Sequence, residues 1–420
     1  MQLNRILPFL VSLFSLAATA QTEQGMQFIQ ANSWEEVKAK AKAENKYIFL
    51  DGYTTWCGPC KMMAVRIFPL PEVGTFYNAN FINVKVQLDT TSNDSEQVKK
   101  WYADGHFLMT EYKINAFPTY IFFSPDGEPV HRAVGASDAE GFISKGKDAL
   151  NPDKQYYRLV AEFRAGNRNP AQMQKLVNAA LAAYDQKNMP EFTQAYYASQ
   201  PDLLTPENMK ILTEVTKSSK DTGFTLMQQY TEKFDSASGN PGDAETAITN
   251  IILREEVFPK ITEGGRKMVT KEPNWLELEK SIAAKYPKYA NSTVLIGQIM
   301  YYRAVQNFPG FSGAVSTLLQ KAPQRLSPEV LNSYAWEIFE KCTDLNCIQQ
   351  AIKWSQKSLE ANNDPMFIDT YANLLHKSGN TKEAISWQKK AIQILKDRGE
   401  DPLGYEDTLS KMEKGEKTWE

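Results

Sequence analysis

The sequence lacks an excess of charge of either sign. Its 420 residues carry 47 Lys and Arg against 50 Asp and Glu, and the formal net charge is −3. A balanced charge provides no basic field that would attract a phosphate backbone, so we expect no nucleic-acid partner. The chain is also poor in cysteine and histidine, the usual ligands of structural zinc, with 4 cysteines and 3 histidines.

Long apolar runs are absent after the N-terminus. Arg5 precedes an apolar stretch over residues 6–18, and Ala18-Thr19-Ala20 has the small-residue pattern that a signal peptidase reads. This stretch is shorter than the roughly 20 residues that a spanning helix needs, although an uncleaved anchor is the alternative. We therefore expect a signal peptide over residues 1–20, cleavage after Ala20, no membrane span in the mature chain, and a periplasmic or secreted location.

The length predicts two or three domains, and the sequence pattern changes near residue 150. Residues 21–150 alternate strand and helix signals, which predicts an α/β layer fold with a mixed sheet. The expected strands cover residues 26–30, 47–53, 81–88, 119–123 and 130–134. The expected helices cover residues 33–44, the segment after Cys60, and residues 93–103 and 139–150.

From residue 151 onward strand signals nearly vanish, and amphipathic helices alternate with short polar breaks. Ala351-Ile352-Lys353-Trp354 returns as Ala384-Ile385-Ser386-Trp387, at a spacing similar to that of tetratricopeptide repeats. We expect an all-α helical-repeat region, with degenerate helical hairpins over residues 151–325 and tetratricopeptide-like repeats over residues 326–420.

The four cysteines form two close pairs, Cys57/Cys60 and Cys342/Cys347. A pair separated by two residues can be a redox pair, half of a zinc site or a structural disulfide. Zinc takes four ligands, and no second half stands at ligand spacing, so we expect no metal. Cys57 follows a buried strand at an expected helix N-terminus, which stabilises a thiolate, and Cys60 should be the less exposed of the two. This setting favours redox chemistry.

The sequence around the first pair resembles that of thioredoxins. The matching features stand in the family's order: Asp51, Trp56-Cys57-Gly58-Pro59-Cys60-Lys61, Lys85, Phe117-Pro118-Thr119 and Val134-Gly135-Ala136. The resemblance covers about residues 26–150. It implies a thioredoxin fold, a cis peptide bond before Pro118, and thiol–disulfide exchange without a cofactor.

The resemblance also implies roles for single residues. Cys57 is the expected nucleophile and Cys60 the resolving cysteine of a redox disulfide, Asp51 accepts a proton, and Lys85 modulates Asp51. Substrate contacts are expected from Trp56, Pro59, Phe117 and Pro118. Asp51 could instead cap a loop, Lys85 could be a strand lysine with its ammonium in water, and Phe117 could serve core packing.

Three further expectations concern residues outside the motif. The segment between Asp89 and Pro118 is nearly twice as long as in ordinary thioredoxins, which could restrict the partners that reach Cys57. Cys342 and Cys347 lie in an expected turn between two helices, which favours a structural disulfide. His106 and His131 have no partner that the sequence identifies, and we expect both on the surface.

The sequence therefore predicts an exported oxidoreductase that reduces protein disulfides, receives electrons from a membrane donor, and recruits partners through its helical region. Two alternatives remain open. One is a helical-repeat scaffold with an accessory redox domain, and the other is a disulfide oxidase or isomerase.

Overall fold

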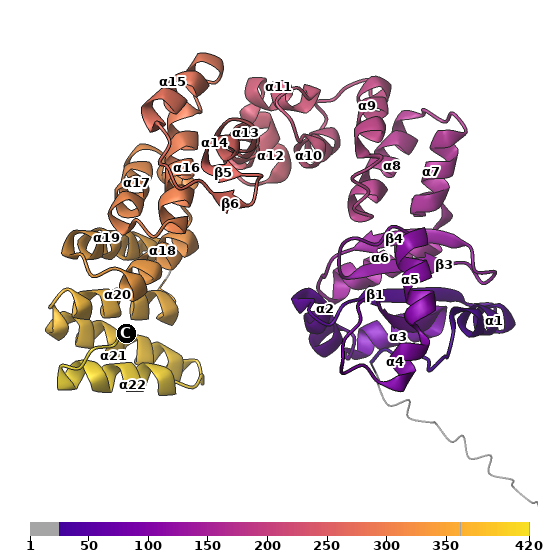
Figure 1. The fold of residues 1–420 in the computed structure, drawn as a ribbon, viewed down its shortest axis with the longest axis horizontal. Helices are drawn as coiled ribbons and strands as arrows, with labels where there is room; N and C mark the ends of the chain where they lie inside the picture. The colour runs from indigo at the N-terminus through magenta and orange to yellow at the C-terminus, as the bar shows by residue number, and fades with distance from the viewer. Residues whose placement is uncertain (1–24, 362, 420) are drawn as a thin grey trace, which may run out of the picture. The chain divides into compact units, whose positions relative to one another are not determined.

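The computed structural model describes residues 25–361 and 363–419 (Figure 1). The expected signal peptide lies outside these residues. The chain divides into two compact units, Met1–Leu203 and Leu204–Glu420, which are described separately below. Among the described residues, no helix combines the length and the apolar character that crossing a membrane requires.

The first unit is built on a four-stranded sheet of order β2-β1-β3-β4. β1 (Tyr47–Tyr53) is parallel to β2 (Phe81–Gln87) and antiparallel to β3 (Thr119–Phe123), which pairs antiparallel with β4 (Pro129–Val134). β1 and β3 occupy the centre of the sheet, and their nearly continuous apolar sequences suit strands buried on both faces.

Helices cover both faces of this sheet, because successive strand residues point to opposite sides. Ile48 and Leu50 pack with side chains of α1 (Trp34–Glu44) and α5 (Tyr102–Glu111). Phe49 packs on the opposite face with side chains of α3 (Pro71–Asn80) and α6 (Ala139–Leu150). The expected α/β layer fold is thereby confirmed.

The elements expected in the first part of the domain agree with the structure only in part. Ser33 caps α1 by accepting a hydrogen bond from the Glu36 backbone N–H, and the Glu36 carboxylate accepts one from the backbone N–H of Asn32. The strand expected over residues 26–30 is wrong, because this described segment makes only isolated backbone bonds such as Ile29 N–H to the Asn83 carbonyl. The helix expected over residues 93–103 also has the wrong bounds. Two helices occupy this region, because α4 (Glu96–Lys100) ends at its C-cap Trp101 and α5 begins directly after it.

The first unit extends beyond the domain boundary expected at residue 150. A 3₁₀ turn (Pro152–Lys154) leads into α7 (Tyr156–Arg164), α8 (Pro170–Ala182) and α9 (Met189–Ser199). His131 on β4 accepts a hydrogen bond at Nδ1 from the Tyr156 backbone N–H at 3.2 Å and is 4% exposed. The expectation that His131 lies on the surface is therefore wrong, whereas His106 is exposed.

The second unit consists almost entirely of helices that pack against their neighbours in sequence. The expected helical region is confirmed, and a short two-stranded antiparallel sheet of β5 (Thr262–Glu263) and β6 (Lys267–Met268) interrupts it. The helices are α10 (Pro206–Val215), α11 (Thr222–Gln229), α12 (Thr231–Ser238), α13 (Asp243–Ile252), a π-helix (Leu253–Val257), α14 (Phe258–Ile261), α15 (Trp275–Lys285), α16 (Ala290–Ala304), α17 (Phe308–Lys321), a 3₁₀ turn (Pro323–Arg325), α18 (Pro328–Lys341), α19 (Leu345–Ala361), α20 (Pro365–Lys377), α21 (Thr381–Asp397) and α22 (Leu403–Lys414).

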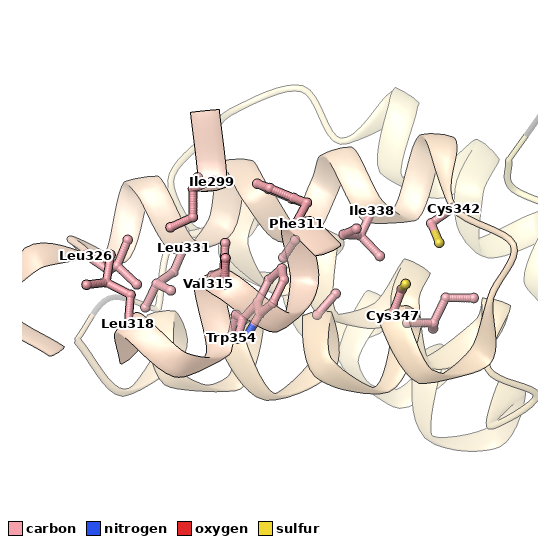
Figure 2. Packing of buried hydrophobic residues seen from close by; sticks show 14 of the residues in the cluster. Ile299, Phe311, Val315, Leu318, Leu326, Leu331, Ile338, Cys342, Cys347 and Trp354 are labelled. Carbon is pink, nitrogen blue, oxygen red and sulfur yellow. The ribbon is translucent and has the colours of Figure 1, made fainter. Parts of the chain in front are cut away.

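The disulfide expected between Cys342 and Cys347 is not formed, and this prediction is corrected. In the described part of the chain both are free thiols, buried at one end of the hydrophobic cluster that Figure 2 shows. The Ser312 hydroxyl donates to the Cys347 sulfur at 3.5 Å, and burial raises the pKa of this thiol to about 12. A buried free cysteine packs as a small apolar residue, and both residues contribute to the cluster in this way.

Candidate active site

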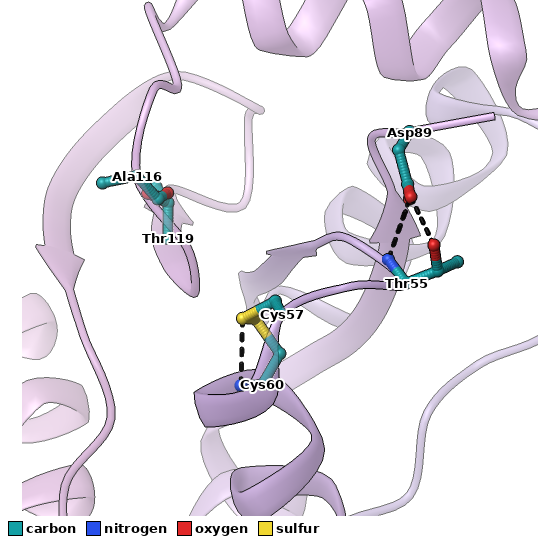
Figure 3. The surroundings of a disulfide bond; sticks show 6 residues. All are labelled: Thr55, Cys57, Cys60, Asp89, Ala116 and Thr119. Carbon is teal, nitrogen blue, oxygen red and sulfur yellow. Dashed lines mark hydrogen bonds between the residues drawn. A yellow bond between two sulfur atoms is a disulfide. The ribbon is translucent and has the colours of Figure 1, made fainter. Parts of the chain in front are cut away.

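Cys57 and Cys60 form a disulfide at the N-terminus of α2 (Gly58–Met62), with their Cα atoms 5.3 Å apart (Figure 3). Cys57 is the N-cap residue, and its sulfur accepts a hydrogen bond from the Cys60 backbone N–H at 3.1 Å. Pro59 stands in the first turn, where its missing N–H leaves no bond unmade. α2 continues into a π-helix (Met63–Ile67).

The two sulfur-bearing residues are similarly buried. Cys57 is 3% exposed and Cys60 is 6% exposed, so the expected difference in exposure is absent from the disulfide form. Trp56 beside them is 68% exposed, and its ring contacts the Phe117 ring edge-on at a centroid distance of 5.6 Å. The surface next to the disulfide therefore offers a flat apolar side chain to the solvent.

A second loop faces the disulfide from across the site. The Phe117–Pro118 peptide bond is cis, and β3 begins directly after it. Figure 3 shows Ala116 and Thr119 of this loop, and the Thr119 hydroxyl donates to the Ala116 carbonyl at 2.7 Å. The buried Arg132 donates from Nη1 to the Tyr112 carbonyl at 2.7 Å, which ties β4 to the chain that enters the loop.

Asp51 lies in the middle of β1, opposite Lys85 of β2 and Tyr120 of β3 in the sheet register. It is 3% exposed, and its Oδ1 has no hydrogen-bond partner among the described residues. Burial raises the pKa of Asp51 to about 7, although the positive charge of Lys85 acts in the opposite direction. A carboxyl group with such a pKa can release and accept a proton near neutrality.

Lys85 is surrounded by aromatic rings. Its Nζ lies 5.2 Å from the Tyr53 ring centroid, 5.3 Å from that of Phe28 and 5.5 Å from that of Phe68. Each ring offers its negative face to the ammonium group. The cation is thereby held beside the strand position that Asp51 occupies on β1.

The long segment before Pro118 is anchored to the core by a few buried side chains. The indole of Trp101, between α4 and α5, donates to the Ala31 carbonyl at 2.8 Å, and Leu108 of α5 is fully buried in the cluster beneath α1. The Trp34 backbone N–H at the start of α1 donates to the Asp104 carboxylate of α5 at 2.7 Å. These contacts fix the segment against the sheet and the first helix.

Sequence reasoning missed two residues that hold the site. Asp89 accepts hydrogen bonds from the backbone N–H and the hydroxyl of Thr55, and Arg132 holds the loop that leads to Pro118. The only signal for Asp89 was its place just after a strand parallel to β1. Among the described residues, no group of three or more His, Cys, Asp or Glu side chains could hold a metal ion.

Part of the chain is similar in sequence to known proteins. The chain is 30% identical over 138 residues to the thiol:disulfide interchange protein DsbD of Escherichia coli K12. That match covers 32% of this chain and 22% of DsbD, so the chain spans about a fifth of the length of the curated relatives it matches.

Two solved structures are also similar to part of the chain. A candidate disulphide-isomerase from Bacteroides thetaiotaomicron is 33% identical, with 30% of this chain and 95% of that one covered and a TM-score of 0.25. The DsbH oxidoreductase is 23% identical, with 33% of this chain and 94% of that one covered and a TM-score of 0.27. The family model for the thioredoxin-like domain matches residues 34–150. Residues 34–150 are a thioredoxin-like domain that carries a disulfide in a Cys-x-x-Cys motif, and a largely helical region follows it.

Proposed function

We propose that this chain is an exported thiol–disulfide oxidoreductase that reduces disulfides of other proteins through Cys57 and Cys60. The observation that carries the proposal is the Cys57–Cys60 disulfide at the N-terminus of α2, across from the loop that holds Pro118. A helix N-terminus favours a thiolate, which is the nucleophilic form of cysteine.

The reaction begins from the reduced dithiol. The Cys57 thiolate attacks one sulfur of the substrate disulfide, so that a mixed disulfide forms and the other substrate sulfur leaves as a thiolate. Cys60 then loses its proton to Asp51 and attacks the Cys57 sulfur. This step forms the Cys57–Cys60 disulfide and releases the second substrate thiolate, which takes up a proton. The substrate disulfide gains two electrons and the enzyme dithiol loses two.

The surroundings of the sulfurs suit a peptide substrate. Trp56 and Phe117 provide apolar contacts beside the disulfide, Pro59 shapes the first turn of α2, and Pro118 turns the facing loop. An extended substrate segment would lie against these four residues. The positive charge of Lys85 lowers the pKa of Asp51 and so limits the rise that burial causes. The helical region that follows the domain recruits partners.

Each turnover leaves the enzyme oxidised, so a donor has to restore the dithiol. Outside the cytoplasm glutathione and thioredoxin do not keep thiols reduced. A membrane protein that passes electrons outward is the donor that this location requires. Electrons from that donor would make the chain a reductase, because the direction of thiol–disulfide exchange depends on the reduction potential of the donor relative to that of the substrate.

The proposal is tested by insulin reduction with the mature chain. The native protein should precipitate reduced insulin in the presence of a dithiol donor, and Cys57→Ser should abolish the reaction. A variant with Cys342→Ser and Cys347→Ser is the control, because it removes two thiols of the second unit and leaves the first unit unchanged. Equal activity of the native protein and Cys57→Ser would refute the proposal.

The protein substrates are identified by trapping. Cys60→Ala leaves Cys57 able to attack but removes the thiol that resolves the mixed disulfide. Protein adducts on Cys57 that dithiothreitol releases should accumulate in this variant and be absent from a variant that also carries Cys57→Ser. Adducts with small thiols alone would count against protein substrates.

A further inference from the structure

Asp89 lies immediately beyond β2, beside the loop that leads into the Cys57–Cys60 motif (Figure 3). β1 and β2 are parallel neighbours, so the residues that follow them emerge at the same edge of the sheet. The Thr55 backbone N–H lies 3.0 and 3.1 Å from the two carboxylate oxygens of Asp89, and the Thr55 hydroxyl donates to Oδ2 at 2.5 Å. One carboxylate thus binds both donors of a single loop residue.

Thr55 belongs to the turn that presents the nucleophile. The Cys57 backbone N–H donates to the Thr54 carbonyl at 3.2 Å, which closes a tight turn with Thr55 and Trp56 at its centre. Cys57 is the N-cap residue of α2 at the end of this turn. Any rotation of the Thr55 backbone would therefore move the Cys57 sulfur relative to the helix N-terminus.

Asp89 is itself held from the opposite side. The Gln87 side-chain amide donates to the Asp89 carbonyl and to the Asp94 carboxylate, both at 3.0 Å. Asp94 also accepts a hydrogen bond from the Tyr102 hydroxyl of α5 at 2.7 Å. The long segment before the cis proline thus supports the loop from which Asp89 reaches Thr55.

We propose that Asp89 is a positioning residue that holds Cys57 in place when the dithiol is reduced. The inference deepens the proposed function and rests on exchange at Cys57 and Cys60. In the disulfide form the S–S bond itself ties Cys57 to α2. Reduction removes that tie, and the turn then depends on its hydrogen bonds, of which the bonds to a carboxylate are the strongest kind.

The test is the equilibrium of the full chain with glutathione, in which the dithiol and one glutathione disulfide give the protein disulfide and two glutathione thiols. A looser Cys57 has to be ordered again when the disulfide closes, which lowers the equilibrium constant. We expect Asp89→Ala to lower the constant about tenfold, as the loss of a charge-assisted hydrogen bond implies. Asp89→Asn keeps an oxygen acceptor for the Thr55 N–H and should stay within about threefold of the native value.

Asp185→Ala is the matched control. Asp185 accepts hydrogen bonds from the Asn188 backbone N–H and from the Tyr156 hydroxyl, which is the same pair of donor types that Asp89 binds. Asp185→Ala should leave the equilibrium constant with glutathione unchanged, even if the variant lowers the stability of the first unit. Equal losses in Asp89→Ala and Asp89→Asn would assign the effect to charge and overturn the inference, as would a native constant in Asp89→Ala.

The measurement separates this inference from the proposed function. Glutathione exchange requires the Cys57–Cys60 pair but no protein substrate. A native chain that leaves insulin intact, combined with the expected loss in Asp89→Ala, would overturn the proposed function and keep the inference. If Asp89→Ala reduces insulin as well as the native chain and has the native glutathione constant, the inference is overturned and the proposed function is kept.

Discussion

Replacing Asp51 by Asn should make the first unit more stable, and the gain should grow with pH. Burial raises the pKa of Asp51 from 3.8 to about 7 in the folded chain. Between these values the folded state binds more protons than the unfolded state, so stability falls as the pH rises through this window. At about 1.36 kcal/mol per pH unit, the buried carboxyl group costs about 1.5 kcal/mol at pH 5 and about 4 kcal/mol at pH 8.

An amide does not titrate, so Asp51→Asn should gain about 2.5 kcal/mol over the native chain between pH 5 and pH 8. Hydrogen exchange of peptides from β1 and β3 in the oxidised protein measures this gain, because central strands exchange through opening of the whole unit. After correction for intrinsic rates, the ratio of protection between variant and native protein should rise about 70-fold.

Asp126→Asn is the control, because this carboxylate is 74% exposed and pairs with the equally exposed Lys42 at 3.4 Å. Its protection ratio to the native chain should stay flat across the same pH range. Parallel profiles of Asp51→Asn and the native chain from pH 5 to pH 8 would refute the reasoning, since they would mean that Asp51 is already ionised at pH 5 without a penalty.

Three further predictions concern other groups of the first unit. Lys85→Met removes the positive charge that lowers the pKa of folded Asp51, so the fall in β1 protection should continue to higher pH than in the native chain, and a profile that levels off at the native pH would contradict this. Burial lowers the pKa of His131 from 6.5 to about 4, so the native chain should lose up to about 3 kcal/mol as the pH falls through that window. His131→Asn should remove this loss, measured by hydrogen exchange of β4, and a persistent loss would exclude His131 as its source. Tyr102→Phe removes the hydroxyl that supports Asp94 and should lower the glutathione constant about twofold, whereas a native constant would show that the support is dispensable.

The sequence was most informative where a local pattern determines a local structure. The apolar run 47–53 is β1, residues 119–123 are β3, and the helix expected over residues 33–44 is α1, with Ser33 as its N-cap. In each case hydrophobicity or capping acts within a few residues. The cis bond before Pro118 had been implied by family resemblance alone, since no property of the run Ala116 to Thr119 distinguishes a cis from a trans bond.

Contacts between distant residues could not be read in this way. Asp89 and Thr55 lie 34 positions apart, and only the parallel register of β1 and β2 brings them together. His131 was expected on the surface because its partner, the Tyr156 N–H, belongs to a helix beyond the expected domain boundary. Cys342 and Cys347 are close in sequence, which favoured a disulfide, but both are free and buried in an apolar cluster, where burial raises the pKa of the Cys347 thiol.

The packing of α7 against β4 has a consequence for how the redox domain can be isolated. β2 and β4 are the edge strands of the sheet. The outer side of β2 is occupied at Asn83, whose carbonyl accepts from Ile29 and whose side chain donates to Gln27, while α7 and α8 pack against β4. A chain cut at residue 150 would uncover β4, and uncovered strands pair readily with other chains. We therefore expect the first helices after the thioredoxin-like domain to protect it from self-association, so a fragment that stays in solution should end near residue 203.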